Sequence, residues 1–255
     1  MIQSTAPIYV GNDVVDLTHP RCRHRPRGDR LPLRVLSPRE MDWFAYPGDP
    51  QHRLRRLWSL WAAKETAFKV VSKLEGSPPV FRHREVEVLL SETGTPDGST
   101  HLRGRVQWRG HRCQVQGLAT PRFLHMIGWG GDGAERDRPR VEVGVDGWGE
   151  EEETAPPTPS ERASGAHHVQ SARARRLVQI RLASYLGPPV KDAQDRPTPR
   201  VRIDTSRNRP GRTPPRVLVD EELRPEIDLS ISHHGRYVAW AFLVPAASPP
   251  PGPVR

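Results

Sequence analysis

Residues 51–74 read QHRLRRLWSLWAAKETAFKVVSKL and carry the clearest helical pattern in the chain. At about 100° per residue, the apolar side chains of this stretch fall on one stripe. The stripe consists of Leu54, Leu57, Trp58, Trp61 and Phe68, together with Ser72. Glu65 lies on the same stripe, and Lys64 and Lys69 lie on its two shoulders. We therefore predict a long helix, ending before Gly76, with a carboxylate on its buried face.

A carboxylate on a buried helix face costs free energy unless it is paired or binds a metal. Glu65 could also sit at the edge of the stripe, where it would reach solvent or pair with an arginine. Residues 8–17, IYVGNDVVDL, predict a strand that places Asp13 among apolar neighbours, although Asp13 could also be a strand-end residue at a turn. Two inward carboxylates with flanking lysines could hold Mg²⁺ against a phosphate, because Mg²⁺ prefers oxygen ligands.

A third informative segment lies near the end of the chain. Residues 227–233 and 237–244 predict two apolar strands joined by a hairpin turn at His234-Gly235-Arg236. His233 shares a strand face with apolar residues, as a core histidine often does. It also stands at the strand end, where it could meet a ligand.

The remaining segments predict a mixed architecture. Ser37-Pro38-Arg39-Glu40 is a helix start, with a Ser cap and Glu three residues later, and that helix should run to about Tyr46. Residues 81–130 alternate as in a small antiparallel meander, and residues 170–186 predict a helix. Residues 131–168 show no periodicity and include an acidic run at 150–153 and three prolines, so we expect a disordered insertion.

Composition limits the possible classes of protein. The chain has 255 residues, a net charge of +9, 35% hydrophobic residues, 28 prolines and 21 glycines, which favours a folded core with disordered segments. The chain contains no run of 18 apolar residues, so no membrane span is predicted. The N-terminus does not resemble a secretory signal. Two isolated cysteines exclude a disulfide scaffold and a cysteine-built zinc site, and favour a reducing cytoplasm.

The basic residues are 35 arginines and only four lysines, three of which are Lys64, Lys69 and Lys73. Where arginine is the usual cation, such a cluster indicates sites that require a compact point charge. A nucleic-acid-binding protein is an alternative suggested by the charge, but aromatic residues are 6% and do not interleave with the arginine clusters.

The three segments, in this order, resemble the 4′-phosphopantetheinyl transferase superfamily. Gly11-Asn12-Asp13 matches its Gly-x-Asp strand, residues 61–69 match its Trp-x-x-Lys-Glu-x-x-x-Lys helix, and residues 230–233 match its Ser-x-Ser-His segment. Gly211-Arg212-Thr213-Pro214 is similar to the turn that precedes that segment. The order of the motifs resembles that of holo-[acyl-carrier-protein] synthases.

The resemblance covers residues 8–75 and 200–244, and implies an α+β fold in which an antiparallel sheet packs against helices, with the β-meander as an added insertion. We divide the chain into an N-terminal part of the transferase domain at 1–130, a disordered linker at 131–168, a C-terminal part at 169–245 and a disordered tail at 246–255.

Val15 stands where longer, surfactin-type enzymes carry a third acidic ligand. Thr18 and His19 stand where synthases carry basic carrier contacts, so docking could use Arg21, Arg23 or Arg34.

The resemblance implies transfer of the 4′-phosphopantetheine arm of coenzyme A to a serine of a carrier protein, with release of 3′,5′-ADP. Asp13 and Glu65 would hold Mg²⁺ on the pyrophosphate, and Lys69 would contact that pyrophosphate. Lys64 would flank the phosphates or help to position Glu65. Ser232 and His233 would hold the nucleotide end, and Arg53 is a candidate for the 3′-phosphate. The base that accepts the serine proton would be Glu65 or a water on the metal.

The expected partner is an acidic carrier protein of fatty-acid, polyketide or peptide synthesis, which a basic face would attract. No nucleic acid and no membrane are expected as partners, and the expected location is the cytoplasm. Holo-synthases assemble as trimers with sites between subunits, but the additional segments here could fill that role within one chain. An inactive paralogue that acts as a binding module is an alternative. The joint presence of Asp13, Lys64, Glu65, Lys69 and His233 argues against it.

Overall fold

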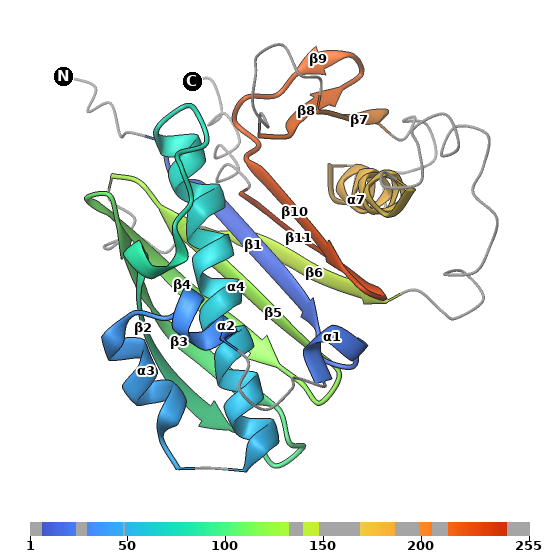
Figure 1. Cartoon of the computed structure of the whole chain (residues 1–255). Helices are drawn as coiled ribbons and strands as arrows, with labels where there is room; N and C mark the ends of the chain where they lie inside the picture. The colour runs from blue at the N-terminus through green and yellow to red at the C-terminus, as the bar shows by residue number, and fades with distance from the viewer. Residues whose placement is uncertain are drawn as a thin grey trace, which may run out of the picture.

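A computed structural model describes residues 7–23, 30–47, 49–132, 140–147, 169–186, 199–205 and 214–243. Its largest element is an antiparallel sheet with the strand order β1-β5-β4-β3-β2. The strands are β1 (Tyr9–Asp16), β2 (Glu87–Gly94), β3 (Thr100–Trp108), β4 (His111–Ala119) and β5 (Phe123–Gly130). Helix α4 (Pro50–Leu74) crosses one face of this sheet (Figure 1).

The long helix predicted over residues 51–74 is confirmed as α4. Its first turn is capped by Asp49, whose carboxylate accepts hydrogen bonds from the backbone N–H groups of Gln51 and His52, and Pro50 occupies the first helical position. Gly76, with φ of 68°, follows the last turn in the left-handed conformation that glycine adopts without strain. Mainly small and aliphatic side chains of α4 pack on the sheet, among them Leu57, Leu60, Ala63, Ala67 and Val70.

Three short helices and one 3-10 turn lie beside α4. They are α1 (Pro20–Arg23), α2 (Leu31–Val35), α3 (Pro38–Ala45) and η1 (His83–Glu85). The predicted start of α3 is confirmed, because the Ser37 hydroxyl accepts from Glu40 N and the Glu40 carboxylate accepts from Ser37 N. No helix in the described segments is long and apolar enough to cross a bilayer.

The second part of the chain forms two smaller sheets with one helix. β10 (Leu229–His234), β11 (Tyr237–Leu243) and β6 (Val141–Gly147) form an antiparallel sheet in the order β10-β11-β6. A third sheet contains β7 (Val201–Asp204), β8 (Arg216–Val219) and β9 (Glu222–Leu223). Helix α7 (Val169–Leu186) buries Val178 and Leu182 against residues of both sheets. The predicted helix at 170–186 and the predicted hairpin of β10 and β11 are therefore confirmed.

The expectation of a disordered insertion over 131–168 is wrong for residues 141–147. They form β6, and each of its residues pairs with one of β11. Val141, Val143 and Val145 do alternate with Glu142, Gly144 and Asp146, but seven residues are too few to stand out between charged flanks. Residues 133–139 and 148–168, the tail at 246–255 and Gly211–Thr213 of the proposed turn lie outside the described residues.

The predicted meander is present as β2 to β5, but its status as an added unit is not confirmed. β5 pairs with β1 along its whole length, from Tyr9 opposite Gly130 to Asp16 opposite Phe123. The meander and the Gly-x-Asp strand are thus parts of one sheet.

The structure contains a repeat that the sequence does not reveal. In the first half, β1 is followed by α4 and later by β4 and β5, and β5 lies between β1 and β4. In the second half, β6 is followed by α7 and later by β10 and β11, and β11 lies between β6 and β10. Both first strands carry Gly-x-Asp, as residues 11–13 and 144–146.

The two halves meet along the outer edge of β1, which we call the β1–β10 junction. Three backbone N–H groups on this edge donate to side chains near or on β10 instead of to another strand. Val10 N bonds Asp228 Oδ2 at 2.6 Å, Asn12 N bonds Ser230 Oγ at 3.0 Å and Asp16 N bonds His234 Nδ1 at 3.0 Å. Buried backbone groups need such partners, so β10 is held in register with β1.

The carbonyl groups on the same edge are satisfied by lysines of α4. Lys73 Nζ donates to Val10 O at 2.7 Å, and Lys69 Nζ donates to Asn12 O at 2.6 Å. Lys73 also donates to Leu229 O at 2.9 Å and pairs with Asp228 at 2.8 Å. Burial lowers the pKa of Lys73, and Asp228 opposes that shift. One ammonium group therefore ties α4, β1 and the start of β10 together.

We expect Lys73→Met to lower the free energy of unfolding by about 3 kcal/mol, because it leaves the partly buried Asp228 carboxylate without its cationic partner. Adding Asp228→Asn should restore part of this loss, since asparagine removes the charge and still accepts from Val10 N. Urea unfolding of the single and double variants measures both effects. Arg109→Met, which breaks an exposed ion pair with Glu75, is the control and should cost less than about 1 kcal/mol. A loss as small as that of the control would contradict the role given to Lys73.

Candidate functional site

Three of the predicted site residues meet where α4 crosses β1. Asp13 points from β1 toward α4, and its Oδ1 lies 3.4 Å from Lys69 Nζ. The Glu65 carboxylate, one helical turn before Lys69, lies close enough to raise the pKa of Asp13. The side chains of Asp13, Glu65 and Lys69 are 16%, 24% and 27% exposed, so a ligand can reach all three.

Local structure explains the close approach of β1 and α4. A Cβ on Gly11 would lie 2.3 Å from Thr66 O of α4 and 2.9 Å from a Val70 methyl group. Only glycine allows the strand to run this close to the helix. The glycine of the Gly-x-Asp motif therefore sets the spacing between the two carboxylates.

Asp13 has an unusual acidity. Burial raises the pKa of Asp13 from 3.8 to about 6, the charge of Lys69 opposes this shift, and the charge of Glu65 adds to it. Two carboxylates that repel each other at a partly exposed site are the oxygen donor set that a divalent cation prefers. The residues present thus fit a magnesium ion, with Asp13 and Glu65 as its protein ligands and Lys69 beside it.

Glu65 lies at the rim of the buried face of α4 and not at its centre. The buried positions of the helix include Ala62, Ala63, Thr66 and Ala67, whereas Trp61, Glu65 and Phe68 are only partly buried. The edge position that the sequence left open is therefore correct, but the neighbour of Glu65 is not an arginine. His83 Nε2 lies 3.4 Å from Glu65 Oε1.

The structure does not bring Lys64 into this site, which corrects its prediction as a phosphate contact. Its side chain is fully buried, and Nζ donates to Val35 O, His83 O and Val86 O at 2.7–2.9 Å. It also pairs with Glu40 at 2.7 Å. Burial lowers the pKa of Lys64, and Glu40 counteracts that shift. Because these groups occupy its donors, Lys64 anchors α2 and η1 beside Glu65, and the positioning role that was its alternative stays a prediction.

Arg53 is also remote from the three residues. It is exposed in the first turn of α4 and lies over the Phe44 ring at 6.0 Å. Twelve residues separate it from Glu65, or about 18 Å along the helix axis. The predicted contact of Arg53 with a 3′-phosphate is therefore not supported by its position.

Ser232 and His233 point to opposite sides of β10. The Ser232 hydroxyl is buried and accepts a hydrogen bond from Asn12 Nδ2 at 3.0 Å, at the β1–β10 junction. His233 is partly exposed, and its Nε2 lies 3.1 Å from Ser171 Oγ of α7. The Ser-x-Ser-His segment thus uses its serines to join the two halves and turns its histidine toward α7.

Asn12, the middle residue of the Gly-x-Asp motif, belongs to this junction. It is fully buried, and its Nδ2 lies 3.4 Å from His125 Nε2 of β5. Burial, with a smaller effect of Lys69, lowers the pKa of His125 to about 3, so this ring is neutral. The pairing could not be predicted, because nothing in the local sequence links β5 to β1.

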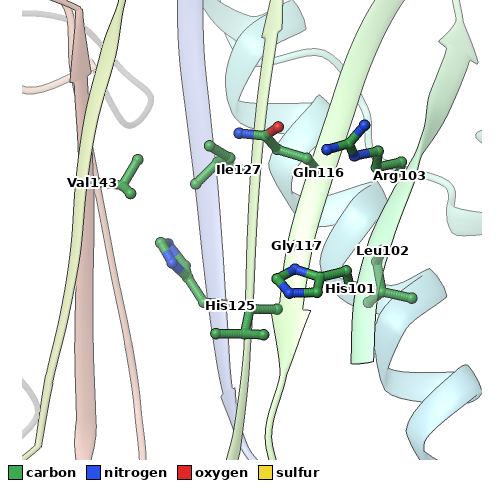
Figure 2. Close-up of a pocket in the computed structure, with 9 residues that line it drawn as sticks. His101, Leu102, Arg103, Gln116, Gly117, His125, Ile127 and Val143 are labelled. Atoms are coloured by element: carbon green, nitrogen blue, oxygen red, sulfur yellow. The ribbon is translucent and has the colours of Figure 1, made fainter. Parts of the chain in front are cut away.

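A hollow of about 220 Å³ lies on the other face of the sheet (Figure 2). His101, Arg103 and Gln116 border it on one side, and His125, Ile127 and Val143 border it on the other. His125 separates it from Asn12, whereas Asp13 faces α4. The hollow is therefore distinct from the carboxylate site.

His19, Cys22 and His234 form another cluster, in which the possible ligand atoms lie within 4.8 Å of one another. His234 Nδ1 accepts from Asp16 N at 3.0 Å, and His19 Nδ1 accepts from Arg21 N at 3.3 Å. A neutral ring that accepts at Nδ1 carries its hydrogen on Nε2, whereas a metal-bound histidine usually donates from its other nitrogen. The hydrogen bonding therefore disfavours a metal at this cluster.

The second repeat lacks the carboxylate pair. Asp146 occupies the place of Asp13 in its Gly-x-Asp triplet, and it forms an ion pair at 3.2 Å with Arg181 of α7. The sequence of α7 contains no acidic residue that could correspond to Glu65. Among the residues that the structure describes, such a carboxylate pair between the Gly-x-Asp strand and the following helix is thus found only in the first half.

Residues 9–117 match the family model of the 4′-phosphopantetheinyl transferase superfamily. The resemblance predicted from the motifs is therefore confirmed over the region that holds Asp13, Glu65 and Lys69. The match ends within β4, so it includes most of the meander but not Ser232 and His233. No curated protein matches the chain. The matched family is a superfamily of transferases.

Lys64 and Lys69 should differ in their effects on stability. We expect Lys64→Met to lower the free energy of unfolding by about 3–5 kcal/mol, because Glu40 would remain buried and unpaired. Lys69→Met leaves the carbonyl of Asn12 without a donor and should cost about 1–3 kcal/mol. Chemical denaturation of both purified variants measures the difference. Equal losses would mean that Lys64 contributes no more to the free energy of unfolding than Lys69 does.

The raised pKa of Asp13 predicts a pH-dependent stability difference in metal-free protein. Ionisation is disfavoured in the folded state, so the contribution of protonated Asp13 is present below about pH 4 and is lost as the pH rises to about 6. The unfolding free energy of Asp13→Asn relative to the wild type should therefore rise by about 2 kcal/mol between pH 4 and pH 7. Urea titrations in EDTA test this. A constant difference would show that burial does not perturb Asp13.

Proposed function

We propose that the chain transfers the 4′-phosphopantetheine group from coenzyme A to a serine of an apo carrier protein, with Mg²⁺, and releases 3′,5′-ADP. The convergence of Asp13, Glu65 and Lys69 within the part of the chain that matches the superfamily carries this proposal. In the reaction, the serine oxygen attacks the phosphorus that bears pantetheine. The bond from that phosphorus to 3′,5′-ADP breaks, and the serine proton leaves to Glu65 or to water.

Each residue of the site has a defined task. Asp13 and Glu65 would hold the metal ion, which when bound offsets the charge that develops on the leaving phosphate. The two protein acceptors of Lys69, Asn12 O and Asp13 Oδ1, account for two of its three N–H donors. The remaining donor would bind an oxygen of the pyrophosphate. Lys69 thus stabilises the empty site and binds the substrate with one ammonium group.

The nucleotide end of coenzyme A would lie toward β10. His233 is partly exposed there and is the better placed of the two predicted contacts. The Ser232 hydroxyl already accepts from Asn12, so its contribution is to hold β10 against β1. Because β10 comes from the second half of the same chain, the site would be complete without a second subunit.

An acidic carrier protein would dock beside α2. Lys64 bonds the carbonyl groups of Val35 in α2 and His83 in η1, so α2 lies next to the turn that faces Glu65. α2 presents the exposed residues Leu33 and Arg34, an apolar and a basic group that suit an amphipathic acidic helix. Both cysteines are thiols, which agrees with a reaction in the cytoplasm.

The decisive experiment incubates the purified chain with coenzyme A, Mg²⁺ and an apo carrier protein, and measures the mass of the carrier. We expect one phosphopantetheine to be added to the carrier serine.

Glu65→Gln and Asp13→Asn should each lower kcat at least 100-fold with circular dichroism unchanged, because each removes a metal ligand. Glu75→Gln, ten residues along the same segment, is the matched control and should retain activity. Full Mg²⁺-dependent transfer by either site variant would contradict the assignment of Asp13 and Glu65 as metal ligands. Coenzyme A binding by the wild type without transfer to any carrier would favour a binding module.

A further inference from the structure

One buried nitrogen near the site has no hydrogen-bond partner among the described residues. It is Nε2 of His83, in η1, and it lies 3.4 Å from Glu65 Oε1. The sequence motifs do not include this residue. A buried donor or acceptor without a partner is costly, so its orientation toward a carboxylate needs an explanation.

The ring of His83 packs against two aromatic neighbours. Trp61, one turn before Glu65 on α4, stacks on it with a centroid distance of 4.5 Å and an interplanar angle of 30°. Phe81 packs on it at 4.3 Å. These contacts leave the ring little freedom to turn its Nε2 edge away from Glu65.

The backbone of His83 is held as firmly as its ring. Its carbonyl accepts a hydrogen bond from Lys64 Nζ at 2.7 Å, and also from Val86 N at 3.2 Å. Lys64 directly precedes Glu65, so adjacent residues of α4 contact the backbone and the ring of the same histidine. This pair of contacts fixes η1 relative to the carboxylate.

We propose that His83 is a positioning residue for Glu65. Its Nε2–H donates to Glu65 Oε1 when the site binds a divalent cation, and so directs the other carboxylate oxygen toward Asp13. This inference rests on the proposed metal-binding role of Glu65. Hydrogen bonds to a ligating carboxylate commonly change metal affinity or activity 10–100-fold.

The test compares His83→Leu, which can pack against Trp61 and Phe81 but cannot donate, with His83→Gln, which keeps an N–H donor. The affinity for Mn²⁺ is measured by electron paramagnetic resonance at saturating coenzyme A without a carrier. We expect His83→Leu to bind Mn²⁺ about tenfold more weakly and His83→Gln to bind within about threefold of the wild type. In transfer assays, kcat should fall in the leucine variant while the KM for the carrier stays constant.

His111→Leu is the matched control, because His111 Nε2 lies 3.5 Å from Glu75 Oε1 away from the site. It should leave Mn²⁺ binding unchanged. Wild-type affinity in His83→Leu, or equal weakening in the glutamine and leucine variants, would overturn the inference. Glu65→Ala separates the two proposals: if it keeps wild-type Mn²⁺ affinity, the metal-binding role of Glu65 fails, whereas if it alone loses affinity, only the role of His83 fails.

Discussion

The buried outer edge of β1 is the constraint on which the arrangement of the molecule depends. An edge strand exposes a row of N–H and C=O groups, and burying that row is possible only if each group finds a partner. Here the N–H groups find side chains of Asp228, Ser230 and His234, and two carbonyl groups find lysines of α4. Four residues of helix rise about 6 Å and two residues of strand about 6.7 Å, so Lys69 and Lys73 match the carbonyl groups of Asn12 and Val10. The same register brings Glu65 to Asp13.

The need to satisfy buried carbonyl groups also explains why α4 carries lysines in a chain that otherwise uses arginine. Lys64 and Lys73 each direct one small ammonium group at several acceptors inside the protein, where a planar guanidinium would need more space. The compact point charges expected from the sequence are therefore real, but two of the three are structural. Lys69 alone combines a backbone contact with partial exposure, which is the combination that a substrate phosphate requires.

The sequence is sufficient to predict elements whose signals are local, and insufficient for partners that are distant along the chain. The periodicity of residues 51–74, the cap at Ser37 and the hairpin at Gly235 predict α4, α3 and β10–β11, and the family motifs select Asp13, Glu65 and Lys69. Periodicity does not tell which acceptors a helix faces, so the sequence leaves Lys64 between a phosphate contact and a positioning role, although its partner Glu40 lies only 24 residues earlier in the chain. The charge of Arg53 makes it a candidate for a phosphate, but the helix places it about 18 Å along its axis from Glu65. His83 carries no motif, and its proximity to Glu65 arises from a turn that follows the helix.

The repeat leaves the two equivalent strands with contrasting edges. β1 is covered along its outer edge by the other half of the molecule, whereas β6 is the last strand of its sheet, with no further strand beside it in the described part of the chain. An open edge invites pairing with another chain and hence aggregation. β6 opposes this with charge, since Glu142 and Asp146 lie along it and form ion pairs with Arg140 and Arg181. Asp146, the counterpart of Asp13 in its Gly-x-Asp triplet, thus places a charged pair on an open sheet edge instead of facing a second carboxylate.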